Sequence, residues 1–249
     1  MLIVGTIVVR TQLNFMQTKK LGLDKEQVLL LRGNTDLLGR LEPFCEKLRA
    51  LSGVESVARA GRSPFETVIG NGFSLNPNPS SGSDWHVVGG ISADVRYLQT
   101  LGIQLIAGKN FDPAKIRGDS TINEFIVNEA FLRHYQLKAE EAVGRKCLFG
   151  NSAQRGPGTI VGVVRDFHAG SFREDIPPLL IQKNPNSYSL CALQLNAGDP
   201  QSILHAVSEQ WNTLFPSAFF EYQFMDEQMA GFYEQEIRLL RLVDLFTGI

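Results

Sequence analysis

The residues best suited to chemistry are Asp166, Phe167 and His168, which close the segment IVGVVRDFH. A carboxylate beside an imidazole can bind a metal ion or move a proton if other segments bring further ligands or a substrate to it. The alternative is a turn from a buried strand into a loop, in which Asp166 accepts hydrogen bonds from nearby backbone amides and Phe167 packs inward. We expect the structural alternative.

Other patterns begin like known sites but lack a necessary part. The loop at 150–158, GNSAQRGPG, has no Gly-Lys-Ser/Thr ending to hold nucleotide phosphates. The run Gly61-Arg62-Ser63-Pro64-Phe65 starts like a nucleophile elbow, but it lacks the closing glycine and has a proline where the helix would start. The histidines show no metal-ligand spacing; they are His86, His134, His168 and His205. The sequence therefore predicts a non-catalytic chain with no cofactor and no metal.

The amino-acid composition argues against nucleic acid as a partner but does not indicate whether the protein lies in a reducing or an oxidising compartment. The 249 residues carry 24 Lys and Arg against 26 Asp and Glu, without a basic stretch, so nucleic acid is not an expected partner. An apolar content of 43% is enough for one large or two small domains. The three cysteines are predicted to be small buried side chains, with one disulfide as the alternative; they are Cys45, Cys147 and Cys191.

Both ends of the chain are apolar. Residues 1–9 read MLIVGTIVV, which is too short to span a bilayer, and RTQLNFMQTKK follows with helical spacing. From Asp226 the pattern is helical and becomes apolar nearly all round after Arg238. We interpret both ends as parts of membrane helices that leave through one surface, with ordinary core elements as the alternative. The predicted membrane-junction residues are Leu2, Ile3, Val4, Ile7, Val8, Val9, Leu239, Leu240, Leu242, Val243, Leu245 and Phe246.

Two stretches share a strand–helix–strand pattern. In the first, residues 28–31 and 54–58 are expected strands around a helix capped by Asn34 and followed by Gly53, with Pro43 predicting a kink or an early break. In the second, residues 190–195 and 219–224 flank a helix with Asp199 as N-cap and Pro200 at its first position. Two such β-α-β units normally share one sheet with their helices on one face.

The segment between these units has a different pattern. Strands are expected at 87–91, 125–127, 146–149, 159–164 and 179–182, short helices at 95–101 and 129–135, and solvated loops at 76–84 and 150–158. The predicted fold class is α+β, a porter-like lobe of two β-α-β units interrupted by a smaller mixed α/β lobe. The expected parts are a stalk at 1–20, a membrane-proximal lobe at 26–75 plus 172–225, an inserted lobe at 85–171, and a stalk helix at 226–249.

An ordered set of segments carries a family resemblance: QLNFMQTKKLGLDKEQVLLL, YLQTLGIQLIAGKNFD, FIVNEAFLRHY, AVGRKC, IVGVVRDFHAGSFREDIPPLL and FEYQFMDEQMAGFYEQEIRLLRLVDLF. Together they resemble the extracytoplasmic domain of MacB/FtsX-type ABC transporter permeases of the Bacteroidetes type. The resemblance implies a periplasmic domain between two membrane helices of the inner membrane, without catalytic residues. It also implies a separate cytoplasmic ABC ATPase subunit, a periplasmic adaptor protein, and a homodimer or paired permease. The ATPase motifs of the family are missing from this chain.

Three functional hypotheses follow. The first is a mechanical relay and docking surface for export or efflux, in which ATP-driven motion shifts the two lobes relative to each other. The second is a ligand-sensing domain of a membrane receptor, which predicts a pocket with convergent polar groups between the lobes. The third is an enzyme, which predicts titratable residues clustered in one cleft around Asp166 and His168.

Overall fold

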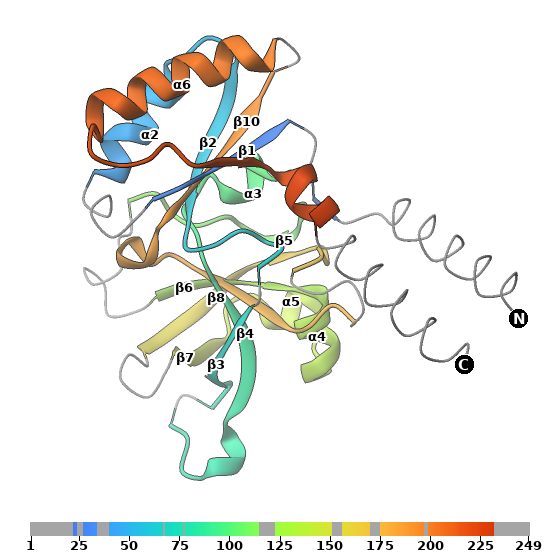
Figure 1. The fold of residues 1–249 in the computed structure, drawn as a ribbon. Helices are drawn as coiled ribbons and strands as arrows, with labels where there is room; N and C mark the ends of the chain where they lie inside the picture. Colours follow the sequence, from blue (N-terminus) through green and yellow to red (C-terminus); the bar gives the residue numbers. More distant parts are fainter. Residues whose placement is uncertain are drawn as a thin grey trace, which may run out of the picture.

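Two β-sheets packed against each other form the frame of the molecule (Figure 1). The structure is a computed structural model that describes residues 22–23, 27–33, 40–66, 68–76, 78–114, 123–150, 156–169, 175–196 and 199–231. The predicted membrane-junction residues and the stalk at 1–20 lie outside these ranges. Of the C-terminal stalk, the described residues 226–231 are helical. No helix in these ranges is both long and apolar enough to cross a bilayer.

The first sheet combines the two predicted β-α-β units. Its strands are β1 (Val28–Arg32), β2 (Val54–Ala60), β10 (Leu190–Leu195) and β11 (Tyr222–Phe224), in the order β11-β1-β10-β2 with every neighbour antiparallel. Helices α2 (Leu41–Arg49) and α6 (Pro200–Leu214) pack together over one face. This is the split β-α-β arrangement that the repeat predicted.

Local sequence explains both helices. The Asp199 side chain accepts hydrogen bonds from the amides of Gln201 and Ser202, at 3.1 and 3.3 Å, and Pro200 occupies the first position of α6 as predicted. In α2, Pro43 lies in the first turn, so its missing amide costs no intrahelical bond. The helix runs from Leu41 to Arg49 without the predicted kink or break, and the expected N-cap Asn34 lies outside the described residues. Gly53, with φ of +93°, lies beyond the helix end at Ala50 and turns the chain into β2.

The second sheet closes into a small barrel. Its strands are β3 (Ile69–Ser74), β4 (His86–Ser92), β5 (Leu105–Gly108), β6 (Asn123–Asn128), β7 (Lys146–Gly150), β8 (Gly156–Val164) and β9 (Leu179–Gln182). The order is β5-β8-β6-β9-β4-β3-β7, and β7 also pairs with β8. The strands from β8 to β7 therefore form a closed ring, and β5 lies outside this ring, paired with β8. A closed ladder leaves few exposed strand edges.

This sheet differs from the predicted inserted lobe in three details. Strands β3 and β9 belong to it, although residues 69–74 and 179–182 fall in the ranges assigned to the other lobe. Residues 156–158 begin β8 and are therefore not part of a loop. The short elements β5 and α5 (Ala139–Ala142) were not predicted from the sequence. The predicted helices are confirmed as α3 (Tyr97–Thr100) and α4 (Glu129–Tyr135).

Three apolar clusters stabilise these layers. One lies between α2, α6 and the first sheet, and it includes Phe44 and Trp211 with ring centroids 5.5 Å apart. A second fills the barrel with side chains from all six of its strands and from α4, such as Phe125 and Phe131. The third, central cluster joins the two sheets and includes Ala58 from β2 and Ile126 from β6. The two lobes therefore share the central cluster.

Candidate functional site

The segment at Asp166 is a structural turn. The Asp166 carboxylate accepts from the Ala130 amide at 2.8 Å and from the Arg133 guanidinium at 2.6 Å, while the Asp166 amide donates to the Glu129 side chain at 2.8 Å. Asp166 thus binds the first turn of α4, whose free amides need an acceptor. Phe167 is fully buried. The predicted strand-to-loop turn and the inward packing of Phe167 are confirmed, but the amide that Asp166 binds belongs to Ala130, which is not a neighbour in the sequence.

We expect Asp166→Ala to destabilise the fold without removing any reactive group. The variant leaves the Ala130 amide without its acceptor and should lower the free energy of unfolding by about 1–2 kcal/mol. Asp166→Asn, which retains one carbonyl oxygen, should lose about half as much. Urea unfolding followed by circular dichroism measures both values. Equal stability of Asp166→Ala and the wild type would contradict the anchoring role.

The other motif residues lie in different parts of the fold. Ser63 is buried and donates its hydroxyl proton to the side-chain carbonyl of Gln228. His86 and His134 meet on the surface with ring centroids 6.1 Å apart, because β4 and α4 bring together residues that sequence spacing does not. His134 and His168 line an open hollow of about 630 Å³. Within the described ranges, no group of three His, Cys, Asp or Glu side chains could hold a metal ion.

A hydrogen-bonded seam joins the two sheets at the end of β2. The Gly61 amide donates to the Ser92 carbonyl at 2.8 Å, and the Asp94 amide donates to the Arg59 carbonyl at 2.9 Å. The Tyr188 hydroxyl donates to the Ala93 carbonyl at 2.8 Å. Strand β2 therefore continues its pairing into the segment that follows β4. We call residues 59–61 and 92–94 the seam.

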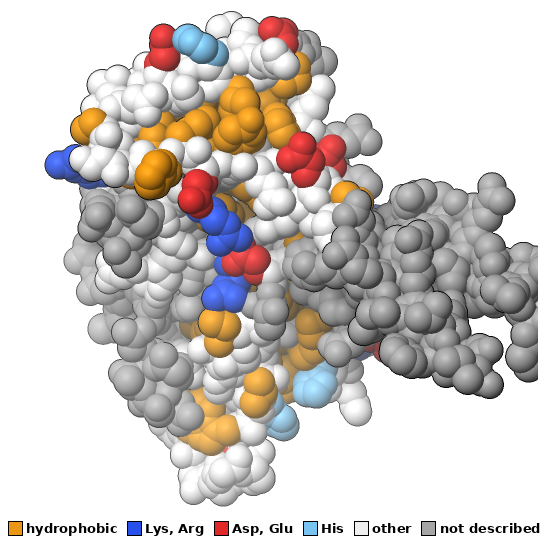
Figure 2. Space-filling view, viewed as in Figure 1, with side chains coloured by type: hydrophobic (Ala, Val, Ile, Leu, Met, Phe, Trp, Pro, Cys, Tyr) orange, Lys and Arg blue, Asp and Glu red, His pale blue; other side chains and the backbone are white. Residues whose placement is uncertain are grey.

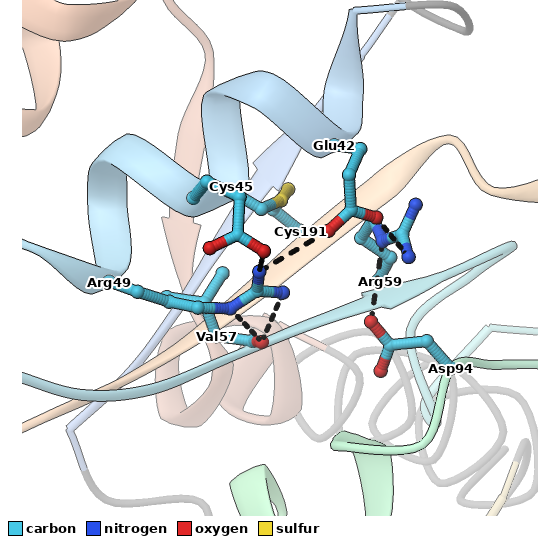
Figure 3. Close-up of a disulfide and its surroundings, with 8 residues drawn as sticks. Glu42, Cys45, Arg49, Val57, Arg59, Asp94 and Cys191 are labelled. Carbon is cyan, nitrogen blue, oxygen red and sulfur yellow. Dashed lines mark hydrogen bonds and ion pairs between the residues drawn. A yellow bond between two sulfur atoms is a disulfide. The ribbon is translucent and has the colours of Figure 1, made fainter. Parts of the chain in front are cut away.

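Charged side chains extend the seam to helix α2 (Figure 3). Arg59 forms ion pairs with Glu42 of α2 and with Asp94, the latter at 3.3 Å, and its guanidinium lies 5.2 Å from the centre of the Tyr188 ring. Asp94 is nearly fully buried. Burial raises the pKa of Asp94 above its usual value, while the Arg59 guanidinium and backbone hydrogen bonds act in the opposite direction. Arg59 therefore stabilises the ionised form of a buried carboxyl.

A disulfide lies beside these ion pairs. Cys45 of α2 and Cys191 of β10 are bonded, and both are fully buried in the cluster between the helices and the first sheet. Cys147 is buried in the barrel as a free thiol, and burial raises its pKa to about 12. The prediction of three buried cysteines is confirmed, and the disulfide alternative holds for two of them.

A polar cleft of about 260 Å³ opens where the seam meets the outside of the barrel. Gly61 and Arg62, which follow β2, form one wall, and residues from β3, β4, β7, β9 and the turn after β9 form the rest. The ligand-sensing alternative predicted a pocket of this kind between the lobes. Gly61 and Arg62 belong to the incomplete nucleophile motif and Gly150 begins the loop at 150–158, while the other lining residues belong to no motif in the sequence.

An apolar patch lies on the first sheet next to its edge strand β11. Phe219 is 90% exposed and Tyr222 is 46% exposed. The partly buried Phe220 contacts Tyr222, with ring centroids 5.4 Å apart. Figure 2 shows hydrophobic side chains gathered over this lobe. Large apolar side chains exposed together are typical of surfaces that bind another protein.

Comparison of the structure with solved structures identifies the fold. It is similar to the periplasmic region of MacB from Actinobacillus actinomycetemcomitans, with a TM-score of 0.56 and 13% identity over 87% of this chain and 96% of that one. It is also similar to the extracellular domain of the ABC-type transporter YknZ from Gram-positive bacteria, with a TM-score of 0.52 and 13% identity over 79% and 97%. No protein-family model and no curated protein matches the sequence. The chain has the mixed α/β fold of the MacB periplasmic domain, as the sequence resemblance predicted.

Proposed function

We propose that this chain is the extracytoplasmic domain of an ABC transporter permease, which relays ATP-driven motion and docks a periplasmic partner during export or efflux. One observation carries the proposal: the similarity in fold covers 96% of the MacB periplasmic region and 97% of the YknZ extracellular domain. Both similar proteins are parts of transporters. ATP hydrolysis then belongs to a separate cytoplasmic ABC ATPase, and the permease works as a homodimer or a pair.

The shared core and the seam favour motion of the domain as one body. Sliding the lobes past each other would separate the apolar side chains of the central cluster and break the hydrogen bonds of the seam. Closely packed interfaces shift between discrete arrangements more readily than they deform continuously. We therefore propose rigid motion of the whole domain, driven from its two ends, as an alternative to the sequence-based hypothesis of lobes moving relative to each other.

Two features support an extracytoplasmic position anchored at both ends. Disulfides persist in oxidising compartments and are rare in the cytosol, which fits Cys45 and Cys191. Leu23 and Met229, which lie near the two ends of the described chain, pack against the same central cluster. We propose that the apolar residues at 2–9 and 239–246 continue from there to the surface of the inner membrane.

Affinity purification of the full-length permease from membranes tests this proposal. Mass spectrometry should identify an ABC ATPase and a periplasmic adaptor among the proteins that copurify. If the apolar patch docks the adaptor, Phe219→Ser combined with Tyr222→Ser should abolish recovery of the adaptor and leave the ATPase. Val87→Ser is the matched control, since Val87 is 75% exposed but belongs to the barrel. Failure to recover any ATPase would overturn the transporter assignment.

A ligand-sensing domain of a receptor is the second candidate function. The polar cleft at the junction of the two sheets favours it, because convergent polar groups in a concave site are the usual mark of a small-molecule site. The same purification distinguishes the two, since a receptor would copurify without an ATPase.

A further inference from the structure

We propose that the outer edge of β11 binds an extended segment of a partner protein, in which apolar and basic residues alternate. The bound segment adds one more strand to the first sheet. The inference deepens the proposed docking role, and it rests on that proposed function for the partner being a protein. Three features of this edge carry it: the outward-facing backbone of β11, a row of aromatic side chains, and the acidic residues beside them.

Strand β11 is an edge of the first sheet. It pairs with β1 on one side, and within the described ranges no strand pairs with its other side. The Phe224 amide donates to the Glu227 side chain at 3.4 Å and therefore points away from β1. Because backbone groups alternate in direction along a strand, the amide and carbonyl of Tyr222 point outward as well. An added strand can form hydrogen bonds with these two groups.

Alternate side chains of this segment form a row of aromatic rings. The ring centroids of Phe220 and Tyr222 are 5.4 Å apart, and those of Tyr222 and Phe224 are 6.4 Å apart. Phe220 and Phe224 pack against the cluster between the helices and the first sheet, whereas Tyr222 is 46% exposed. On a strand added beside β11, every second side chain would lie on the same face as this row. Apolar residues at those positions would cover the Tyr222 ring.

Acidic residues lie beside the aromatic row. Glu221 and Gln223 alternate with the aromatic residues along the chain, and with Glu227 they line a groove of about 510 Å³. Glu221 and Glu227 are both exposed. The arginine in this lining, Arg32, forms an ion pair with Glu66. Figure 2 shows acidic side chains at the border of the hydrophobic surface of this lobe. The charge of the groove therefore favours lysine or arginine in the bound segment.

A second copy of this chain fits the edge less well. Pairing of two β11 strands would bring the carboxylates of Glu221 and Glu227 from both copies to the same junction, and like charges facing each other across strands are destabilising. A compact apolar ligand would leave the outward backbone groups of Tyr222 without a partner. An extended segment with alternating apolar and basic residues matches the backbone, the aromatic row and the carboxylates together.

Fluorescence anisotropy with labelled peptides of about eight residues tests the inference on the purified 249-residue chain. The first peptide alternates lysine and valine, and the second alternates glutamate and valine. Two more repeat the first peptide with N-methyl groups on all valines or on all lysines, which removes the amide donors from one side of the strand. We expect saturable binding of the lysine–valine peptide and binding roughly tenfold or more weaker for the glutamate–valine peptide. One N-methylated peptide should lose binding and the other should keep it, because the donors of a strand alternate in direction.

Variants then assign the binding to the edge of β11. Tyr222→Ser should weaken binding of the lysine–valine peptide roughly tenfold. Glu221→Lys should weaken it roughly fivefold or more, and it should bind the glutamate–valine peptide more tightly than the wild type does. Glu209→Lys is the matched control, since it makes the same change of charge at an exposed position of α6 outside the groove. If Tyr222→Ser does not fold, the exchange of peptide preference in Glu221→Lys decides.

Four results would overturn the inference. They are no binding of the lysine–valine peptide at millimolar concentration, equal binding of the glutamate–valine peptide, equal behaviour of the two N-methylated peptides, and edge variants that bind like the wild type. Analytical ultracentrifugation adds a fifth: a dimer that Tyr222→Ser dissociates would make a second copy the occupant. Failure of the peptides to bind, with an ATPase still recovered from membranes, would leave the proposed function standing. Peptide binding without recovery of an ATPase would overturn only the proposed function.

Discussion

Removing the bond between Cys45 and Cys191 is expected to lower the melting temperature of this chain by roughly 5–20 °C. The two cysteines are 146 residues apart, so the bond closes a very long loop in the unfolded chain. Loss of such a constraint costs about 2–5 kcal/mol of stability. For a chain of this size each kcal/mol shifts the midpoint by roughly 2–4 °C. Thermal unfolding of the wild type and of the Cys45→Ala, Cys191→Ala double variant measures the difference.

The third cysteine supplies the control for this experiment. Cys147 is buried in the barrel, and its raised pKa keeps the thiol protonated and unreactive at neutral pH. Cys147→Ala should therefore respond to reduction as strongly as the wild type does, whereas the double variant should not respond. Alkylation of the unfolded, non-reduced protein should modify one cysteine of the three. Modification of all three would show that the disulfide is absent, and the support it gives to an oxidising compartment would be lost.

The first sheet could be predicted from the sequence because its signals are local. Periodic apolar residues and the Asp199-Pro200 start define α6, strands β1 and β10 are short, mainly apolar runs, and β2 mixes apolar with polar residues after the turn at Gly53. Their assembly into one sheet follows from the general behaviour of two β-α-β units. The errors in this region are also local. Pro43 predicted a kink because its position relative to the helix start could not be fixed from the sequence.

Closure of the barrel could not be predicted because it depends on pairings between distant segments. Strand β3 contains two glycines in IGNGFS and lacks an apolar run, so propensity gives no signal for it. Its place is set by pairing with β4 and β7, whose residues lie up to 78 positions away in the register Gly72 to Gly150. The inserted lobe expected at 85–171 excluded β3 and β9, because their place in the barrel depends on such distant pairings.

In the candidate site too, features with a local sequence signal could be predicted, and features that depend on distant segments could not. The turn at Asp166 could be predicted because the apolar strand β8 ends just before it, at Val164. The partners of Asp166 in α4 could not be predicted, since they lie more than 30 residues away in the sequence. The cleft was missed because its residues come from five separate segments that only the sheet pairings bring together. The seam was missed too, since nothing near Arg59 in the sequence indicates that Asp94 is its partner.

Replacement of Arg59 by methionine is expected to cost about 3–5 kcal/mol of stability, because it leaves the buried Asp94 carboxyl without its cation. Methionine keeps much of the side-chain volume, so lost charge and hydrogen bonding dominate the effect. Arg49→Met is the matched control, because Arg49 also binds Glu42, whereas the ion pairs of Arg49 in the described part of the chain involve Glu42 and Glu46 and not Asp94. Chemical denaturation should show a much smaller loss for this control.

The dependence on pH separates the Asp94 contribution from other effects of the substitution. Burial holds the pKa of Asp94 above its unfolded value, and without Arg59 that pKa should rise further. A raised pKa contributes stability that is present below the unfolded pKa, near 3.8, and is lost as the pH rises through the folded pKa. The deficit of Arg59→Met relative to the wild type should therefore grow from acid to neutral pH. In a protein that already carries Asp94→Asn, the Arg59→Met substitution should cost less stability, and this cost should not change with pH. A deficit that is independent of pH in both backgrounds would show that Arg59 stabilises the seam through packing on Tyr188, with no electrostatic link between the two sheets.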